Sequence, residues 1–348
     1  MSFSVGIVGL PNAGKSTLFH AITKKQVEIA DYPFTTVDPN VGVVNVPDPR
    51  LEKISSLINP EKTTETIIEF VDIAGLVENA HKGEGLGNQF LAQIRECDAI
   101  IEVVRVFNSS EKPDPDKDVK TINTELLMKD LETAEKAIEK NEEEEGLLNK
   151  IKEGLEKQKK IKDMELTEEE KEKIKEYQFL TSKPKLYLFN FKEQGHAPSQ
   201  DNAFLIDAKT EEELADLSEE EKKELGVSSK LDQLISVCYT ILDLITFYTI
   251  TGGKEARAWT LKKGSSVFEA AGQVHSDFQD NFIKADLLKY EGLISTGSWN
   301  KAKEAGLVGL VAPNVVNSGV IKAKLGRVQL AAGDTPTIDF YGDGLLKV

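Results

Sequence analysis

A short glycine-bearing segment near the start constrains this sequence more than any other feature. Residues 9–16 read GLPNAGKS, which fits the pattern G-x-x-x-x-G-K-[ST]. The apolar run 3–8 before it predicts a buried strand, and residues 15–23 after it predict a helix. In this order, backbone N–H groups and the positive end of the helix converge on phosphate oxygens. The segment therefore predicts a nucleoside triphosphate site.

Each residue type in this loop suits a contact with a triphosphate. Lys15 is expected to reach the terminal phosphates, where its charge also serves catalysis, and Ser16 is expected to ligate Mg²⁺. The nucleotide-binding residues predicted in this segment are Asn12, Ala13, Gly14, Lys15, Ser16 and Thr17.

Two further segments place the chain in the GTPase-like branch of such proteins. Residues 72–75 read DIAG and end an apolar strand, as a D-x-x-G motif should. Asp72 is expected to hold a magnesium-bound water, and the Gly75 N–H to touch the γ-phosphate. The segment 32–36 (YPFTT) has no strong periodicity. A threonine there can ligate Mg²⁺ only while the γ-phosphate is present, which predicts a switch loop.

The first hundred residues alternate strand and helix patterns, which predicts an α/β domain with a largely parallel sheet. Residues 121–179 are charged and carry apolar residues every three or four positions, which predicts a helical hairpin followed by a third helix. A capping box, Thr167 with Glu170, marks the start of that third helix. Strand patterns return at Lys185, and a helix is expected over 231–245.

These changes in composition and in predicted secondary structure indicate three domains. From about residue 246 the chain has short β-like runs, many glycines and a helix near 267–278, which indicates a small α+β domain. The expected domains are a discontinuous nucleotide-binding domain (1–120 and 180–245), an inserted helical arm (121–179) and a C-terminal domain (246–348).

Composition excludes several classes of protein. The formal net charge of the 348 residues is −16, which repels nucleic-acid phosphates at long range, so any contact with nucleic acid needs a local basic patch. The chain has only two cysteines, Cys97 and Cys238, which is too few for a disulfide framework or for a cysteine-rich zinc site. Residues 1–6 (MSFSVG) contain no basic residue and lead directly into a strand pattern, so we expect no signal peptide. The most apolar window, 234–250, falls short of the ~20 residues of a membrane span and is interpreted as a buried helix. We expect a cytoplasmic protein with no membrane contact.

Base recognition is expected on the strand that ends at Asn190. GTPases have N-K-x-D there, whereas residues 190–193 read NFKE. Phe191 replaces the lysine that stacks on guanine, and Glu193 is one methylene longer than the aspartate that accepts from it. These changes favour adenine, with Asn190 at a base edge, although Glu193 as a plain surface charge stays an alternative. Ala208 lies where a second base loop belongs.

Six segments together resemble the Obg-like ATPases of the YchF type. They are residues 9–17, 32–42 (YPFTTVDPNVG), 72–91 (DIAGLVENAHKGEGLGNQFL), 122–126 (INTEL), 255–260 (EARAWT) and 270–278 (AAGQVHSDF). The resemblance covers nearly the whole chain, and the long D-I-A-G block is highly specific.

The resemblance implies a fold and a site. The fold is an α/β, P-loop GTPase-type sheet of the TRAFAC class, with an inserted α-helical hairpin arm and a C-terminal α+β domain of β-grasp (TGS) type. The family hydrolyses ATP in preference to GTP and associates with the ribosome. Its Mg²⁺ ligands map onto Ser16 and Thr36, and its N-x-x-E pattern onto Asn190 and Glu193. Asn12 matches the asparagine that helps hold K⁺ in potassium-dependent relatives.

One departure from the family concerns catalysis. Small GTPases follow D-x-x-G with a glutamine that orients the attacking water, but here Leu76 cannot hydrogen-bond. The family usually supplies a histidine from the loop after the next strand, and in this chain that loop, 107–119, has none. Slow hydrolysis is therefore expected. His81, in a glycine-rich segment, is a candidate replacement, weighed against an exposed loop histidine. The predicted catalytic residues are Lys15, Thr36, Gly75 and His81.

The main hypothesis is a Mg²⁺-dependent ATP-hydrolysing switch that associates with the ribosome, at the large subunit. Contacts with rRNA or tRNA are expected through the TGS domain and the helical arm. Basic clusters at 254–257, 262–263 and 322–327 are the candidate RNA contacts, against lone surface lysines. Two alternatives stay open: a nucleotide-gated ribosome adaptor that does not hydrolyse, and a GTPase.

Overall fold

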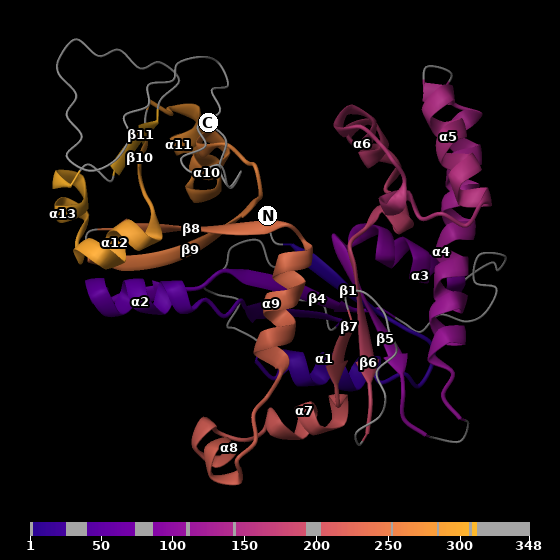
Figure 1. Ribbon diagram of the computed structural model, residues 1–348, viewed down its shortest axis with the longest axis horizontal. Coiled ribbons are helices and arrows are strands. Elements are labelled where there is room, and N and C mark those ends of the chain that lie inside the picture. The colour runs from indigo at the N-terminus through magenta and orange to yellow at the C-terminus, as the bar shows by residue number, and fades with distance from the viewer. Residues whose placement is uncertain are drawn as a thin grey trace. The chain divides into compact units, whose positions relative to one another are not determined.

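The computed structural model groups the chain into two compact units (Figure 1). The N-terminal unit comprises residues 2–45 and 67–242, and the C-terminal unit comprises 46–66 and 243–348. The structure describes residues 3–25, 40–73, 86–108, 112–141, 144–192, 203–251, 253–283, 285–305 and 308–311. The expected arm, 121–179, groups with the N-terminal unit, whereas 46–66 groups with the C-terminal unit and not with the nucleotide-binding residues around it in sequence.

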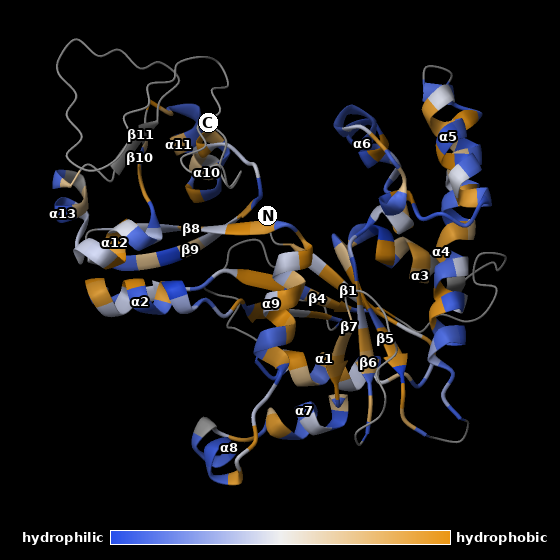
Figure 2. Cartoon of the chain, in the orientation of Figure 1, coloured by the Kyte–Doolittle hydropathy of each residue, from blue (hydrophilic) through white to orange (hydrophobic). Residues whose placement is uncertain are grey.

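A six-stranded sheet forms the centre of the N-terminal unit, in the order β2-β4-β1-β5-β6-β7. Its strands are β1 (Ser4–Val8), β2 (Val41–Asn45), β4 (Ile67–Asp72), β5 (Ala99–Arg105), β6 (Lys185–Asn190) and β7 (Ala203–Ile206). Only β2 runs antiparallel to its neighbour, so the largely parallel sheet is confirmed. The central strands are hydrophobic along most of their length (Figure 2), as strands covered on both faces should be.

The helices of this unit are α1 (Lys15–Thr23), α3 (Leu86–Glu96), α7 (Ala208–Leu214), α8 (Glu219–Leu225) and α9 (Leu231–Ile241). They include the expected helix 15–23, two helices that the sequence did not predict (α7 and α8), and one that requires a correction. The interpretation of 234–250 as one buried helix is wrong, because α9 ends at Ile241 and β8 (Leu244–Thr251) follows. Asp243 between them has a left-handed φ of 53°, and the β-branched residues after it pair with a neighbouring strand.

The arm contains the expected helical hairpin. Helices α4 (Pro115–Ile138) and α5 (Glu145–Glu156) pack against each other, and η4 (Ile161–Asp163), α6 (Glu168–Ile174), η5 (Lys175–Tyr177) and η6 (Leu180–Ser182) follow. The capping box of Thr167 and Glu170 is confirmed. Helix α4 starts earlier than residue 121, because Asp114 caps it and Pro115 suits its first turn. The loop after β5 is therefore shorter than the expected 107–119.

Buried polar groups fasten the arm to the sheet. Asp130 on α4 is fully buried, and its two carboxylate oxygens accept the backbone N–H groups of Leu180 and Thr181, each at 2.7 Å. On the sheet, the Lys185 Nζ contacts Glu102 Oε2 at 2.7 Å and Asn123 Oδ1 of α4 at 2.8 Å. Burial raises the pKa of both Glu102 and Asp130, despite these partners.

The C-terminal unit contains a three-stranded sheet in the order β3-β9-β8 and a two-stranded one. The strands are β3 (Lys62–Thr64), β8, β9 (Glu255–Lys262), β10 (Ala285–Leu288) and β11 (Val308–Val311), and the helices are α2 (Pro49–Ile58), α10 (Val267–Val274), α11 (Ser276–Asp280), α12 (Tyr290–Thr296) and α13 (Trp299–Glu304). The apolar core joins α2 and α12 to β9 through Leu51, Ala256 and Leu293. The expected helix 267–278 is broken at His275, whose Nδ1 accepts the Asp277 N–H and caps α11.

No helix in the described parts of either unit is both long and apolar enough to cross a membrane.

We expect Asp130→Asn to lower the free energy of unfolding, and to do so more at about pH 5.5 than at about pH 7.5. An amide has one acceptor oxygen, so one buried N–H loses its partner, at a cost of about 1–3 kcal/mol. Burial raises the pKa of Asp130 to about 6, above its value in the unfolded chain. The wild-type group therefore contributes most stability at low pH and loses it as the pH rises through about 6.

Urea unfolding at the two pH values measures both effects. Asp163→Asn, at an exposed arm position, is the matched control and should change little at either pH. A cost of Asp130→Asn that grows with rising pH would contradict this account of the carboxylate.

Candidate nucleotide site

The loop between β1 and α1 is shaped to hold an anion. Gly14 precedes α1 with a left-handed φ of 100°, no side chain caps the helix, and its first turn has no acidic residue. The first N–H groups of α1 are therefore open to a ligand. A Cβ at Gly9 would lie 2.5 Å from the Val103 carbonyl oxygen, and one at Gly14 would lie 2.2 Å from Asn190 Nδ2. Both glycines are required for this close packing.

Lys15 is 8% exposed, and its Nζ donates to the Leu10 carbonyl oxygen at 3.1 Å. Burial lowers the pKa of this ammonium below its usual value, while the charge of Asp72 acts in the opposite direction. An anionic oxygen beside Nζ would stabilise the charged form more strongly than a neutral carbonyl does. Lys15 is thus a largely buried cation at the end of the loop, where α1 begins.

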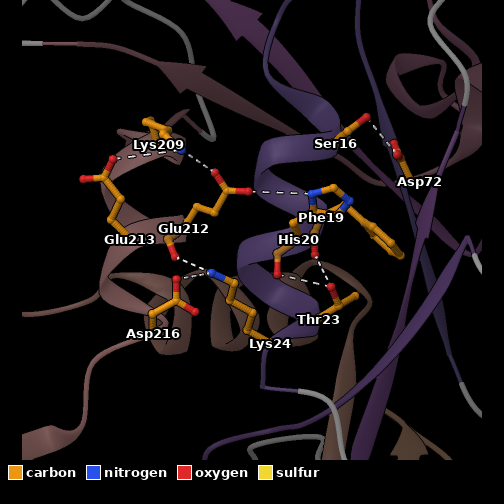
Figure 3. A network of polar contacts seen from close by, with 10 residues as sticks. All are labelled: Ser16, Phe19, His20, Thr23, Lys24, Asp72, Lys209, Glu212, Glu213 and Asp216. Carbon is orange, nitrogen blue, oxygen red and sulfur yellow. Dashed lines mark hydrogen bonds and ion pairs between the residues drawn. The ribbon is translucent and has the colours of Figure 1, made fainter.

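Ser16 and Asp72 bring a hydroxyl and a carboxylate together beside the phosphate loop. The Ser16 hydroxyl donates to Asp72 Oδ2 at 3.1 Å, across the gap between α1 and the end of β4 (Figure 3). A hydroxyl and a carboxylate at this separation fit a hard cation such as Mg²⁺, which takes few protein ligands and completes its shell with water and phosphate. The described residues contain no cluster of three or more His, Cys, Asp or Glu able to hold a metal by themselves.

Asn190 joins the phosphate loop to the start of α7, where a base loop was expected. Its Nδ2 donates to the Ala13 carbonyl oxygen at 2.9 Å, and its Oδ1 accepts the Ala208 N–H at 3.0 Å. Asn190 was expected at a base edge, but both ends of its amide contact the protein. The Phe191 N–H donates to the Ile206 carbonyl oxygen, and its half-buried ring has the Lys230 Nζ 5.9 Å from its centre.

A network of charged side chains ties α1 to α7 (Figure 3). The Lys24 Nζ contacts Asp216 Oδ2 at 2.6 Å and donates to the Glu212 carbonyl oxygen at 3.0 Å. The Glu212 carboxylate accepts from Lys209 at 2.9 Å and lies 3.6 Å from His20 Nδ1. This network was not predicted, because pairs that lie 188 and 192 positions apart leave no periodic signal in the sequence.

Several expected site residues lie outside the described residues. They are Thr36, Gly75, His81 and Glu193, together with Leu76. Of the described histidines, His20 faces Glu212 and His275 caps α11. The structure therefore brings together Lys15, Ser16, Asp72, Asn190 and Ala208 around the phosphate loop.

Comparisons with known proteins agree with this geometry. A family model described as a 50S ribosome-binding GTPase matches residues 4–150. A second model, the C-terminal domain of YchF GTPases, described as a protein of unknown function (DUF933), matches residues 244–321.

Close relatives extend over almost the whole chain. The ribosome-binding ATPase YchF of Bacillus subtilis is 46% identical over 89% of this chain and 95% of its own length. That of Escherichia coli O157:H7 is 42% identical over 88% and 94%. The structure of the Schizosaccharomyces pombe YchF GTPase is similar, with a TM-score of 0.79 and 32% identity over 92% of this chain and 96% of that one. The first two of these relatives are more than 40% identical over nearly their whole length, and the phosphate loop and the sheet agree with them. The chain therefore belongs to the YchF family.

Proposed function

We propose that this protein is a Mg²⁺-dependent ATPase that associates with the ribosome. One observation carries the proposal. Helix α1 begins without a side-chain cap, its first residue is the buried Lys15, and Ser16 contacts Asp72. The curated relatives at 42–46% identity are named ribosome-binding ATPases.

The chain's own residues position and stabilise the phosphates. The N–H groups of the loop and of α1 bind phosphate oxygens, and Lys15 exchanges the Leu10 carbonyl for a phosphate oxygen. Ser16 would hold Mg²⁺ directly and Asp72 through water, and the ion would neutralise charge that develops on the phosphates. Thr36 as a further metal ligand, the Gly75 N–H at the γ-phosphate, and Asn12 beside a K⁺ ion complete the proposed site.

Leu76 stands in the position of the GTPase glutamine and cannot orient the attacking water, so another group must do so. The loop between β5 and α4 contains no histidine and is short, because α4 already begins at Pro115. We propose that His81 supplies this function and that hydrolysis without the ribosome is slow.

Single-turnover hydrolysis of ATP and GTP tests the proposal, in K⁺ or Na⁺ and with or without ribosomes. We expect ribosome-stimulated ATP turnover that falls about 100-fold in His81→Ala, because general acid–base and water-orienting groups contribute this much. His275→Ala, a capping histidine in the C-terminal unit, is the matched control and should keep the wild-type rate.

Two other outcomes would change different parts of the proposal. Tight ATP binding with no turnover under any condition would make this chain a nucleotide-gated adaptor. Full turnover in His81→Ala would remove that residue from the mechanism while leaving the ATPase proposal intact.

Base preference is tested by Phe191→Lys combined with Glu193→Asp. This change restores the guanine-reading pattern, so the ratio of the ATP and GTP dissociation constants should shift toward GTP. A good bidentate contact with a base is worth about 1–3 kcal/mol of discrimination. Titration with fluorescent ATP and GTP analogues measures the ratio. An unchanged ratio would mean that residues 190–193 do not read the base.

Asn190→Asp tests the junction between the phosphate loop and α7. The carboxylate still accepts the Ala208 N–H but faces the Ala13 carbonyl oxygen without a proton to donate. We expect ATP affinity to fall about tenfold or more, because an unpaired buried acceptor costs about 1–3 kcal/mol. Asn141→Asp on the arm, where the amide donates to the Tyr177 hydroxyl, is the control. Equal affinity in the two variants would contradict a positioning role for Asn190.

Charge indicates where the ribosome is contacted. The N-terminal unit carries the whole formal charge of −16, while 15 basic and 15 acidic residues balance in the C-terminal unit. A polyanion is therefore repelled less by the C-terminal unit. In that unit the guanidinium of Arg257 lies 4.2 Å above the ring of Trp259. We propose that the C-terminal unit contacts RNA of the large subunit near Arg257. The acidic arm is the weaker candidate for a contact with RNA.

A further inference from the structure

We infer that one apolar cluster couples the phosphate loop to the helical arm, so that the bound nucleotide sets how firmly the arm is attached. The inference rests on the proposed function, because it needs a nucleotide at the phosphate loop. The cluster joins β1 and the residue after β4 to α3, α4 and η6, and its buried members are Val8, Ile73, Phe90, Leu91, Ile94, Cys97, Ile100, Ile122, Leu126 and Leu180.

Two residues connect this cluster to the nucleotide site. Ile73 is fully buried in it and directly follows Asp72, the proposed holder of the magnesium-bound water. Leu10 belongs to the phosphate loop, packs against the cluster, and offers its carbonyl oxygen to the Lys15 Nζ at 3.1 Å. A phosphate that draws Lys15 away from Leu10 therefore changes the hydrogen bonding of a residue packed on the cluster.

The arm contributes three residues to the same cluster. Ile122 and Leu126 from α4 and Leu180 from η6 are each about 1% exposed within it. The backbone N–H groups of Leu180 and of the next residue, Thr181, both donate to the buried carboxylate of Asp130. Any shift in the cluster thus reaches the point where the arm returns to the sheet.

Polar contacts reinforce the link between α3 and the arm. The Arg95 Nη2, in the last turn of α3, donates to Thr133 Oγ1 of α4 at 2.6 Å. The Lys183 Nζ, just after η6, donates to the Arg95 carbonyl oxygen at 2.8 Å and to that of Cys97. Packed interfaces of this kind change between discrete arrangements and do not deform gradually. The end of α3 and the base of the arm should therefore move as one body.

The amide groups of Leu180 and Thr181 report the coupling directly, because their hydrogens are bonded to Asp130. Hydrogen exchange is measured by mass spectrometry on peptides covering residues 177–183, in the full-length protein. The three states are nucleotide-free, saturated with Mg²⁺ and ADP, and saturated with Mg²⁺ and a non-hydrolysable ATP analogue. We expect the exchange rate in this segment to differ about fivefold or more between the free and ATP-analogue states, the lower range of known coupling between sites.

Two matched variants separate coupling from simple stability. Thr133 and Thr124 both lie on α4 and both donate to the carbonyl oxygen four residues earlier, at 2.9 and 2.8 Å. Thr133→Val removes the Arg95 contact as well, whereas Thr124→Val does not. We expect the nucleotide-dependent difference to shrink in Thr133→Val and to persist in Thr124→Val.

Three results would overturn the inference. One is exchange at 177–183 that is the same in all three states of a wild-type protein that binds nucleotide. Another is an increase in exchange at 177–183 in Thr133→Val that is the same with and without nucleotide. That result would mean that the Arg95–Thr133 contact only stabilises the structure. The third is a protein that binds no nucleotide by direct titration, which overturns the proposed function and the coupling together.

Discussion

The amide of Asn190 is the interaction on which the nucleotide site depends. It donates to the phosphate loop at Ala13 and accepts from the first residue of α7 at Ala208, so it holds the phosphate loop and the start of α7 at a fixed separation. Gly14 is pressed so closely against this amide that no other residue fits there. The charged network between α1 and α7 supports the same two elements further along their length. Exposed pairs of this kind are individually weak, so the buried amide is the stronger constraint.

Buried polar groups have a second role in joining the arm to the sheet. Asp130 satisfies two backbone N–H groups where the chain leaves the arm, and Lys185 contacts both a sheet carboxylate and α4. Such groups cost free energy unless every partner is in place, so they specify one arrangement more strictly than apolar packing alone. The arm is thereby attached in one arrangement, and its residues share an apolar cluster with Leu10 and Ile73.

Much of the fold could be predicted because its signals are local. The helix 15–23, the parallel strands and the capping box of Thr167 follow from periodicity and end signals that a few neighbouring residues carry. The error over 234–250 has a physical reason: a continuous apolar run fits a helix or a strand equally well, and strand pairing with β9 decided the second half. Helix α2 was missed although Asp48 and Pro49 mark its start.

The chemistry of the phosphate loop can be predicted from local sequence, because glycine, lysine and serine stand at a fixed spacing between one strand and one helix. The sequence also predicts the alternation of strands and helices, and it sets the charge of the chain. The fold was needed to show that Asn190 joins the phosphate loop to α7, that residues 46–66 belong with the C-terminal unit, and that Leu10 and the arm share one cluster. These facts depend on contacts between residues far apart in the chain, and such contacts leave no pattern in a single sequence.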